Sequence, residues 1–133
     1  MKSQKKDYAR WKNNILAVDD DPDIVRLIGQ ALSKHGLKVS AFTDPDTALE
    51  GFKVNRKDCA MISSDIRMPR MNGYEFVKKT KEIDKHAKVI LMSAFEIQEK
   101  EFHYALPDIK VDGFLQKPFS IQQLNDVILK MNS

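Results

Sequence analysis

The sequence predicts a three-layer α/β sandwich around a parallel, five-stranded sheet. Five short apolar runs alternate along the chain with segments whose apolar residues recur every three or four positions, which is the pattern of strands alternating with helices. The runs are almost wholly apolar, as expected of strands that helices cover on both faces. The chain has 133 residues, 42% of them hydrophobic, which is enough for about one domain with a buried core.

Each predicted element has its own signal. The strands are the apolar runs at residues 15–18, 39–42, 59–62, 89–92 and 113–116. Two helices begin at Asp21-Pro22 and Asp44-Pro45, where a capping carboxylate precedes a proline that the first helical turn tolerates. Ser120 and Gln123 form a capping box before the last helix. The remaining two helices are expected after Asn72-Gly73 and, more weakly, over residues 97–105.

The chain divides into a basic extension over residues 1–13 and one domain over residues 14–133. The extension holds five basic residues, whereas the whole chain has 22 basic and 19 acidic residues, so we expect no direct nucleic-acid binding by the domain. The single cysteine, Cys59, cannot form an internal disulfide and indicates a cytoplasmic protein. No apolar run reaches the ~18 residues of a membrane span, so we expect no membrane partner.

Polar residues follow four of the predicted strands. Asp19 and Asp20 follow the first strand, Asp65 the third, Ser93 the fourth and Lys117 the fifth. The carboxyl ends of parallel strands share one edge of the sheet, where the active crevice of such folds lies. We therefore expect three carboxylates, a hydroxyl and an ammonium group to converge there.

This combination is typical of phosphoryl transfer onto an aspartate. Clustered carboxylates repel one another unless a cation neutralises them, and Mg²⁺ suits a site of oxygen ligands, with Mn²⁺ as a substitute. A carboxylate can then attack a phosphoryl group, while the Lys117 ammonium and the Ser93 hydroxyl stabilise the phosphoryl oxygens. The plainer reading of Asp21 and Asp23 is that they only cap a helix.

Four segments together resemble the receiver domain of two-component response regulators. They are ILAVDD at residues 15–20, SDIRMPRMNG at 64–73, LMSA at 91–94 and FLQKPF at 114–119. The resemblance covers roughly residues 14–132. It implies the CheY-like, flavodoxin-like sandwich with strand order 2-1-3-4-5 and five helices.

The resemblance also assigns roles to individual residues. Asp65 would be the phosphoacceptor for a histidine kinase or a phosphotransfer protein, and Lys117 would contact the phosphoryl group. Asp20 and Asp65 would ligate Mg²⁺, with Asp19 holding a metal-bound water and the Arg67 carbonyl completing the set. Ser93 and Phe114 would form the switch pair, and the Lys117–Pro118 peptide would be cis.

By the same resemblance, phosphorylation repacks the face formed by the fourth helix, fifth strand and fifth helix, which signals to a downstream protein. The protein would be a monomer or a phosphorylation-dependent homodimer. Residues 96–112 fit the family pattern poorly, so this output face is the least transferable part. We further expect Arg67 and Phe95 to shield the phosphoryl group from water and lengthen its life.

Several other functions remain open. The chain fits a single-domain switch that catalyses only its own phosphotransfer and dephosphorylation, and its start at Met1 favours a complete short protein. Alternatively it is an excised receiver of a larger DNA-binding transcriptional regulator. A haloacid-dehalogenase-type phosphohydrolase would have an aspartate where Arg67 stands. A receiver-like scaffold would lack part of the acidic, hydroxyl and lysine set, and a flavodoxin would have a Ser/Thr/Gly-rich phosphate loop after the first strand.

Overall fold

The computed structural model of the chain describes residues 14–68, 70–94 and 108–131. Its centre is a five-stranded sheet in the order β2-β1-β3-β4-β5, and all neighbouring strands are parallel. The strands are β1 (Asn14–Val18), β2 (Lys38–Phe42), β3 (Cys59–Asp65), β4 (Val89–Ser93) and β5 (Gly113–Gln116). This arrangement confirms the predicted fold class and strand order.

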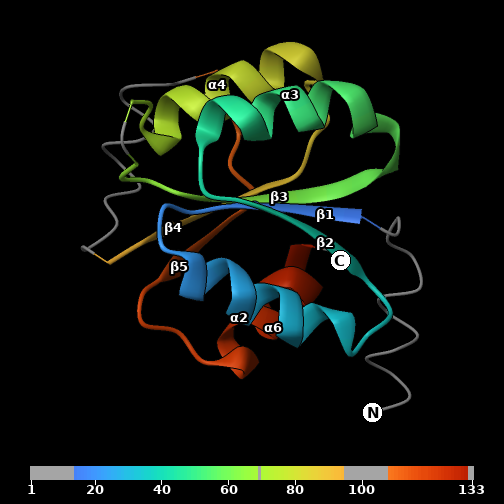
Figure 1. Ribbon diagram of the computed structural model, residues 1–133, viewed down its shortest axis with the longest axis vertical. Helices are drawn as coiled ribbons and strands as arrows, with labels where there is room; N and C mark the ends of the chain where they lie inside the picture. Colours follow the sequence, from blue (N-terminus) through green and yellow to red (C-terminus); the bar gives the residue numbers. More distant parts are fainter. Residues whose placement is uncertain (1–13, 69, 95–107, 132–133) are drawn as a thin grey trace.

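Helices cover both faces of the sheet (Figure 1). They are α2 (Pro22–Ser33), α3 (Pro45–Asn55), α4 (Gly73–Ile83) and α6 (Ile121–Met131), and a short 3-10 helix spans Arg56–Asp58. In Figure 1, α3 and α4 lie above the sheet, whereas α2 and α6 lie below it. These are the α-helices of the described residues, and the helix predicted over 97–105 lies outside them. None of the four is long and apolar enough to span a membrane.

Alternate residues of the strands supply the two halves of the core. Ile15 and Ala17 of β1 belong to the apolar cluster that packs against α2 and α6, whereas Leu16 and Val18 belong to the cluster under α3 and α4. All four are at most 3% exposed. Because the central strands β1, β3 and β4 of this parallel sheet are covered on both faces, near-continuous apolar runs are the sequence pattern that they require.

The predicted helix starts are present. The Asp21 carboxylate accepts from the Asp23 N–H and the Asp44 carboxylate from the Thr47 N–H, both at 2.9 Å. Ser120 and Gln123 exchange both hydrogen bonds of the capping box. Each bond satisfies an N–H that has no partner inside its helix.

The third strand is longer than the sequence predicted. Residues 59–62 are strand as expected, but β3 continues to Asp65 and includes Ser63 and Ser64, both fully buried. The physical reason is pairing on both sides, since Ser63 lies beside Ala17 of β1 and Ile90 of β4. Backbone hydrogen bonding in a central strand overrides the polar side chains that suggested an earlier end.

An ion pair fixes the start of β5, at the edge of the sheet opposite the ends of the strands. The Asp112 N–H donates to the Val89 carbonyl at 2.9 Å, and the Val89 N–H donates to the Asp112 carboxylate at 2.8 Å. Lys81 of α4 lies 3.7 Å from the same carboxylate and also donates to the Ala87 carbonyl. Both charged side chains are largely buried, so the pair ties α4 to the junction of β4 and β5.

Candidate functional site

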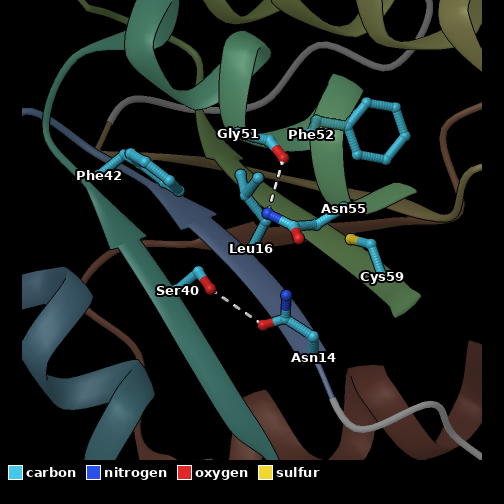
Figure 2. A pocket seen from close by; sticks show the side chains of 8 residues that line it. All are labelled: Asn14, Leu16, Ser40, Phe42, Gly51, Phe52, Asn55 and Cys59. Carbon is cyan, nitrogen blue, oxygen red and sulfur yellow. Dashed lines mark hydrogen bonds between the residues drawn. The ribbon is translucent and has the colours of Figure 1, made fainter. Parts of the chain in front are cut away.

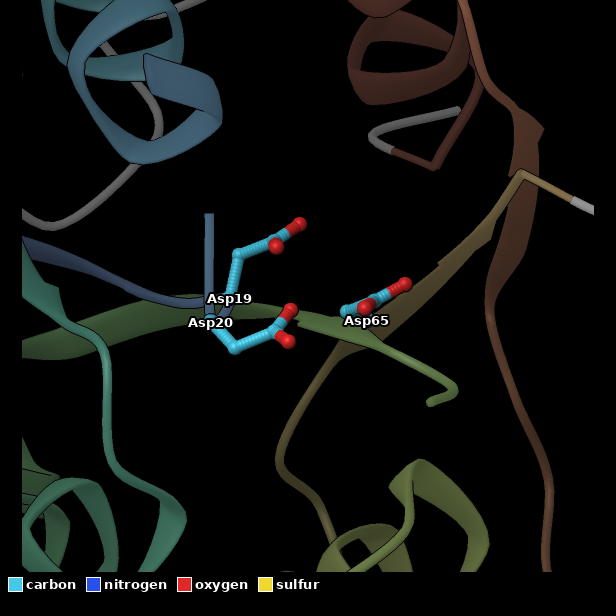
Figure 3. Close-up of side chains that lie close together, drawn as sticks. All are labelled: Asp19, Asp20 and Asp65. Carbon is cyan, nitrogen blue, oxygen red and sulfur yellow. The ribbon is translucent and has the colours of Figure 1, made fainter. Parts of the chain in front are cut away.

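The carboxyl edge of the sheet brings together the acidic side chains that the sequence placed there. Asp19 and Asp20 follow β1, and Asp65 is the last residue of the neighbouring β3 (Figure 3). One carboxylate oxygen from each lies within 4.8 Å of the others. We call these three residues the acidic cluster. Three convergent oxygen donors, two from buried residues and one from an exposed residue, suit a hard divalent cation.

Lys117, which directly follows β5, joins the acidic cluster. Its Nζ donates to Asp19 Oδ2 at 2.6 Å and lies 3.3 Å from Asp65 Oδ1. Its backbone N–H donates to the Ser93 carbonyl at 2.7 Å, and the Lys117–Pro118 peptide is cis, as expected. The ammonium group thus lies between the two buried carboxylates, although 98 residues separate it from Asp19.

The environment shifts the pKa of each buried group at this edge. Burial raises the pKa of Asp19 to about 6, although the hydrogen bond from Lys117 opposes the shift. Burial also raises the pKa of Asp65, against the attraction of Lys117. Burial alone would lower the pKa of Lys117, but its bond to Asp19 and the two carboxylate charges outweigh that effect and raise it. The cluster therefore favours a cation more strongly than exposed carboxylates would.

The loop after β3 packs closely against Asp65. A Cβ atom on Gly73 would lie 2.5 Å from the Asp65 carbonyl oxygen and 2.7 Å from the Ile66 Cα, so only glycine fits there. The Gly73 N–H donates to the Ile66 carbonyl at 2.6 Å, and the Asn72 side chain caps α4 through the Glu75 N–H. These contacts fix the end of β3.

Arg70 connects this loop to the preceding crossover, between β2 and β3. It adopts a left-handed backbone conformation with φ of 71°, which is uncommon for a residue other than glycine. Its guanidinium lies 3.4 Å from the carboxylate of Asp44, the N-cap of α3. The loop that follows the acidic cluster is thereby held against the start of α3.

The predicted switch residues lie on the last two strands. Ser93 ends β4, one residue beyond Met92, the strand partner of Asp65, and is 4% exposed. Phe114 is a half-buried residue of β5 that lies beside Leu91 and packs against the core under α3 and α4. Arg67 has an exposed side chain, and Phe95 lies outside the described residues.

Two features of this edge had no signal strong enough to predict them. The sequence placed Lys117 at the same edge as the acidic cluster but did not show which carboxylate it contacts. The Ser63 hydroxyl, two residues before Asp65, is buried and has no hydrogen-bond partner among the described residues. A serine in a buried strand can be located from sequence only after the strand's true end is known.

Comparison with known proteins identifies the family. The family model for the response regulator receiver domain matches residues 15–129. The chain belongs to this family. Receiver domains are signalling switches that bind Mg²⁺ at an acidic pocket. The acidic cluster of this chain is such a group of acidic residues.

Curated receiver proteins resemble the chain over most of its length. The response regulator receiver protein CpdR of Brucella abortus is 32% identical over 118 residues, which cover 88% of this chain and 94% of CpdR. The response regulator SaeR of Staphylococcus epidermidis is 31% identical over 123 residues, covering 90% of this chain and 52% of SaeR. The chain thus spans about half the length of its SaeR relatives and nearly all of CpdR.

Solved receiver structures share the fold. The chemotaxis protein CheY4 of Vibrio cholerae superposes with a TM-score of 0.79 at 28% identity, covering 90% of this chain and 98% of CheY4. The response regulator TrrA of Thermotoga maritima, solved in complex with Mg²⁺-BeF, gives a TM-score of 0.76 at 26% identity, covering 90% and 98%.

Proposed function

We propose that the chain is a phosphorylation-dependent switch that accepts a phosphoryl group on Asp65. The observation that carries the proposal is the placement of the Asp65 carboxylate beside two further carboxylates and 3.3 Å from the Lys117 ammonium. Few structural roles require this combination, because clustered carboxylates destabilise a folded protein unless a ligand uses them.

The chemistry follows from the groups at this edge. An Asp65 carboxylate oxygen attacks the phosphorus of a phosphohistidine on a histidine kinase or phosphotransfer protein. The new O–P bond forms as the P–N bond breaks, and the imidazole leaves with the bonding electrons. The Lys117 ammonium then exchanges part of its contact with Asp65 for the phosphoryl oxygens, and the Ser93 hydroxyl donates to the same group.

A divalent cation fits the donor set. Asp20, Asp65 and the Arg67 carbonyl would hold Mg²⁺, or Mn²⁺ in its place, while Asp19 would hold a metal-bound water. When bound, the cation supplies positive charge that stabilises the phosphoryl oxygens.

Phosphorylation would change the surface formed by β5 and α6. As the Ser93 hydroxyl moves toward the new dianion, Phe114 turns into the space that it leaves, and this repacks the surface of β5 and α6. The predicted helix 97–105, which would complete this surface, lies outside the described residues. A downstream protein would bind this surface, with the chain acting as a monomer or as a phosphorylation-dependent homodimer in the cytoplasm.

Arg67 and Phe95 would set the lifetime of the phosphoryl group. Their side chains would exclude water from the acyl phosphate. Phe95→Glu should then speed dephosphorylation, measured as loss of phosphoprotein after removal of the donor. An unchanged decay rate would remove this role.

The chain functions either alone or as part of a larger protein. Its coverage of nearly all of CpdR favours a single-domain switch, with residues 1–13 as an extension and 14–133 as the domain, and with no separate enzymatic output. Its coverage of about half of SaeR favours the alternative, the receiver of a larger DNA-binding regulator. The length of the full open reading frame distinguishes the two.

Intact-protein mass spectrometry tests the central proposal. The protein is incubated with acetyl phosphate with and without Mg²⁺, and Asp65→Ala is compared with Asp46→Ala, which removes an exposed carboxylate of α3. We expect one phosphoryl group on the wild type and on Asp46→Ala, only with Mg²⁺, and none on Asp65→Ala. Phosphorylation of Asp65→Ala to the wild-type extent would refute the assignment of Asp65.

A further inference from the structure

A small cavity that shares no residue with the acidic cluster lies near the start of β1 and β3 and the end of α3 (Figure 2). Its volume is about 20 Å³. The lining combines the apolar side chains of Leu16, Phe42 and Phe52 with the polar side chains of Asn14 and Asn55. A cavity of this size admits one group about as large as a water molecule or a methyl.

Hydrogen bonds hold the polar wall of the cavity in place. Ser40 Oγ donates to Asn14 Oδ1 at 3.0 Å, and Asn55 Nδ2 donates to the Gly51 carbonyl at 3.2 Å (Figure 2). Gly51 also leaves room for the ring of Phe42, because a Cβ atom there would lie 2.8 Å from Phe42 Cζ. The cavity is therefore formed before any ligand binds, which is usual for binding sites.

Three cationic residues are neighbours, in the sheet or along the chain, of residues that line this cavity. Lys38 is the strand partner of Asn14, and the alternation of β2 places it on the same face as Ser40. Arg56 and Lys57 directly follow Asn55. We call Lys38, Arg56 and Lys57 the cationic rim. All three side chains are exposed, and none forms an ion pair with a carboxylate among the side chains that the structure describes, which do not include that of Asp58.

We propose that the cavity and the cationic rim bind an acidic peptide segment of a partner protein, with one methyl group of a small apolar side chain of that peptide inserted into the cavity. Charge complementarity carries the choice of partner, because exposed cations beside a cavity that is apolar in part attract carboxylates that neighbour an apolar residue. Val54, beside the rim, is 80% exposed and offers further apolar contact.

Charge also excludes the nearest alternative occupant. Residues 1–13 precede Asn14 in the chain, but they contain five basic residues and one acidic residue. Their net positive charge would be repelled by the cationic rim. The inference does not depend on Asp65, since the cavity and the acidic cluster share no residue.

Cys59 provides a direct readout, because it lines the cavity and is the only cysteine of the chain. The probe is a synthetic peptide with acidic residues on both sides of a central valine. The rate of Cys59 modification by methyl methanethiolsulfonate is measured by intact mass at increasing peptide concentration. We expect saturable protection, giving a dissociation constant that weakens as salt rises.

Charge variants test the cationic rim. Lys38→Glu combined with Arg56→Glu should weaken the peptide about tenfold, since reversing two exposed charges costs roughly 1.4 kcal/mol. The matched control is Lys78→Glu, which reverses an exposed cation of α4 that also has no carboxylate partner among the described residues, and it should change affinity less than about twofold.

Three outcomes would overturn the proposal. If Lys78→Glu weakened peptide binding as much as the double variant of the cationic rim, binding would be explained by general charge attraction. If a peptide with glycine in place of the valine bound with equal affinity, the cavity would not take part in binding. Protection of Cys59 by phosphatidylglycerol vesicles, or by raising the protein concentration, without protection by the peptide would make the occupant a lipid surface or a second copy. The peptide, vesicle and protein-concentration measurements use the wild-type protein, so they do not depend on the folding of any variant.

Discussion

Replacing Gly73 by alanine should destabilise the protein even though alanine is the better helix former. The added Cβ atom would lie 2.5 Å from the Asp65 carbonyl oxygen and 2.7 Å from the Ile66 Cα. Both are backbone atoms, so no side chain can turn away. Restoring ordinary contact requires the end of β3 and the start of α4 to separate by about 1 Å, and such overpacking typically costs about 1–3 kcal/mol.

Gly29→Ala is a matched control within the same chain. Gly29 lies inside α2, and a Cβ atom there meets nothing within 4 Å. This substitution should stabilise the protein by about 0.5–1 kcal/mol, because alanine loses less backbone entropy in a helix. The two glycine-to-alanine changes are therefore expected to have opposite signs.

Urea unfolding of both variants, followed by circular dichroism, measures the difference. For a slope of about 1–3 kcal/mol per molar urea, the midpoint of Gly73→Ala should fall by roughly 1 M, whereas that of Gly29→Ala should rise slightly. Gly73→Ala should also slow phosphorylation by acetyl phosphate, because the backbone of Asp65 must move. A midpoint for Gly73→Ala at or above the wild-type value would refute the packing argument.

Three further changes test other parts of the structure. Ser63→Ala should raise the free energy of unfolding by about 1 kcal/mol in urea, since it removes a buried hydroxyl without a partner among the described residues; a lower midpoint would show that the hydroxyl is satisfied. In metal-free protein, the pKa of Asp19 is about 6 in the folded state and 3.8 in the unfolded state. Between these pH values the folded state binds more protons than the unfolded state. The free energy of unfolding should therefore fall as pH rises from 4 to 6. Asp19→Asn should weaken this dependence in thermal unfolding with EDTA, leaving the part that the raised pKa of Asp65 contributes, and parallel profiles for the two proteins would contradict the assignment. Lys81→Met should cost about 1–3 kcal/mol by leaving the largely buried Asp112 uncompensated, whereas Lys79→Met, in an exposed pair, should cost less than about 0.5 kcal/mol; equal costs would show that burial does not matter here.

The location of the acidic cluster was predictable because topology determines it. In a parallel sheet every strand ends at the same edge, so a residue's position after an apolar run is enough to place it there. This reasoning brought Asp19 and Asp65 together from segments 46 residues apart in the chain. The caps at Asp21 and Asp44 were equally clear, since each lies directly before the proline that opens its helix.

Side-chain pairing across the fold was not predictable in the same way. Lys81 and Asp112 lie 31 residues apart and have no local pattern, because their contact depends on how α4 packs beside β5. The length of β3 was misjudged at Ser63 because local propensity cannot report that both neighbouring strands continue. The cavity beside Asn55 likewise arises only from packing, and no residue around it has a sequence signature.

The anchoring of β5 limits how a signal can travel through it. At its start, Asp112 exchanges two hydrogen bonds with the first residue of β4. Just beyond its end, the Lys117 N–H binds the Ser93 carbonyl while the ammonium group reaches the acidic cluster. A four-residue strand tied at both ends has little freedom to slip along its neighbour. The proposed switch at Phe114 would then work by rotation of its side chain, while the backbone of β5 keeps its place beside β4.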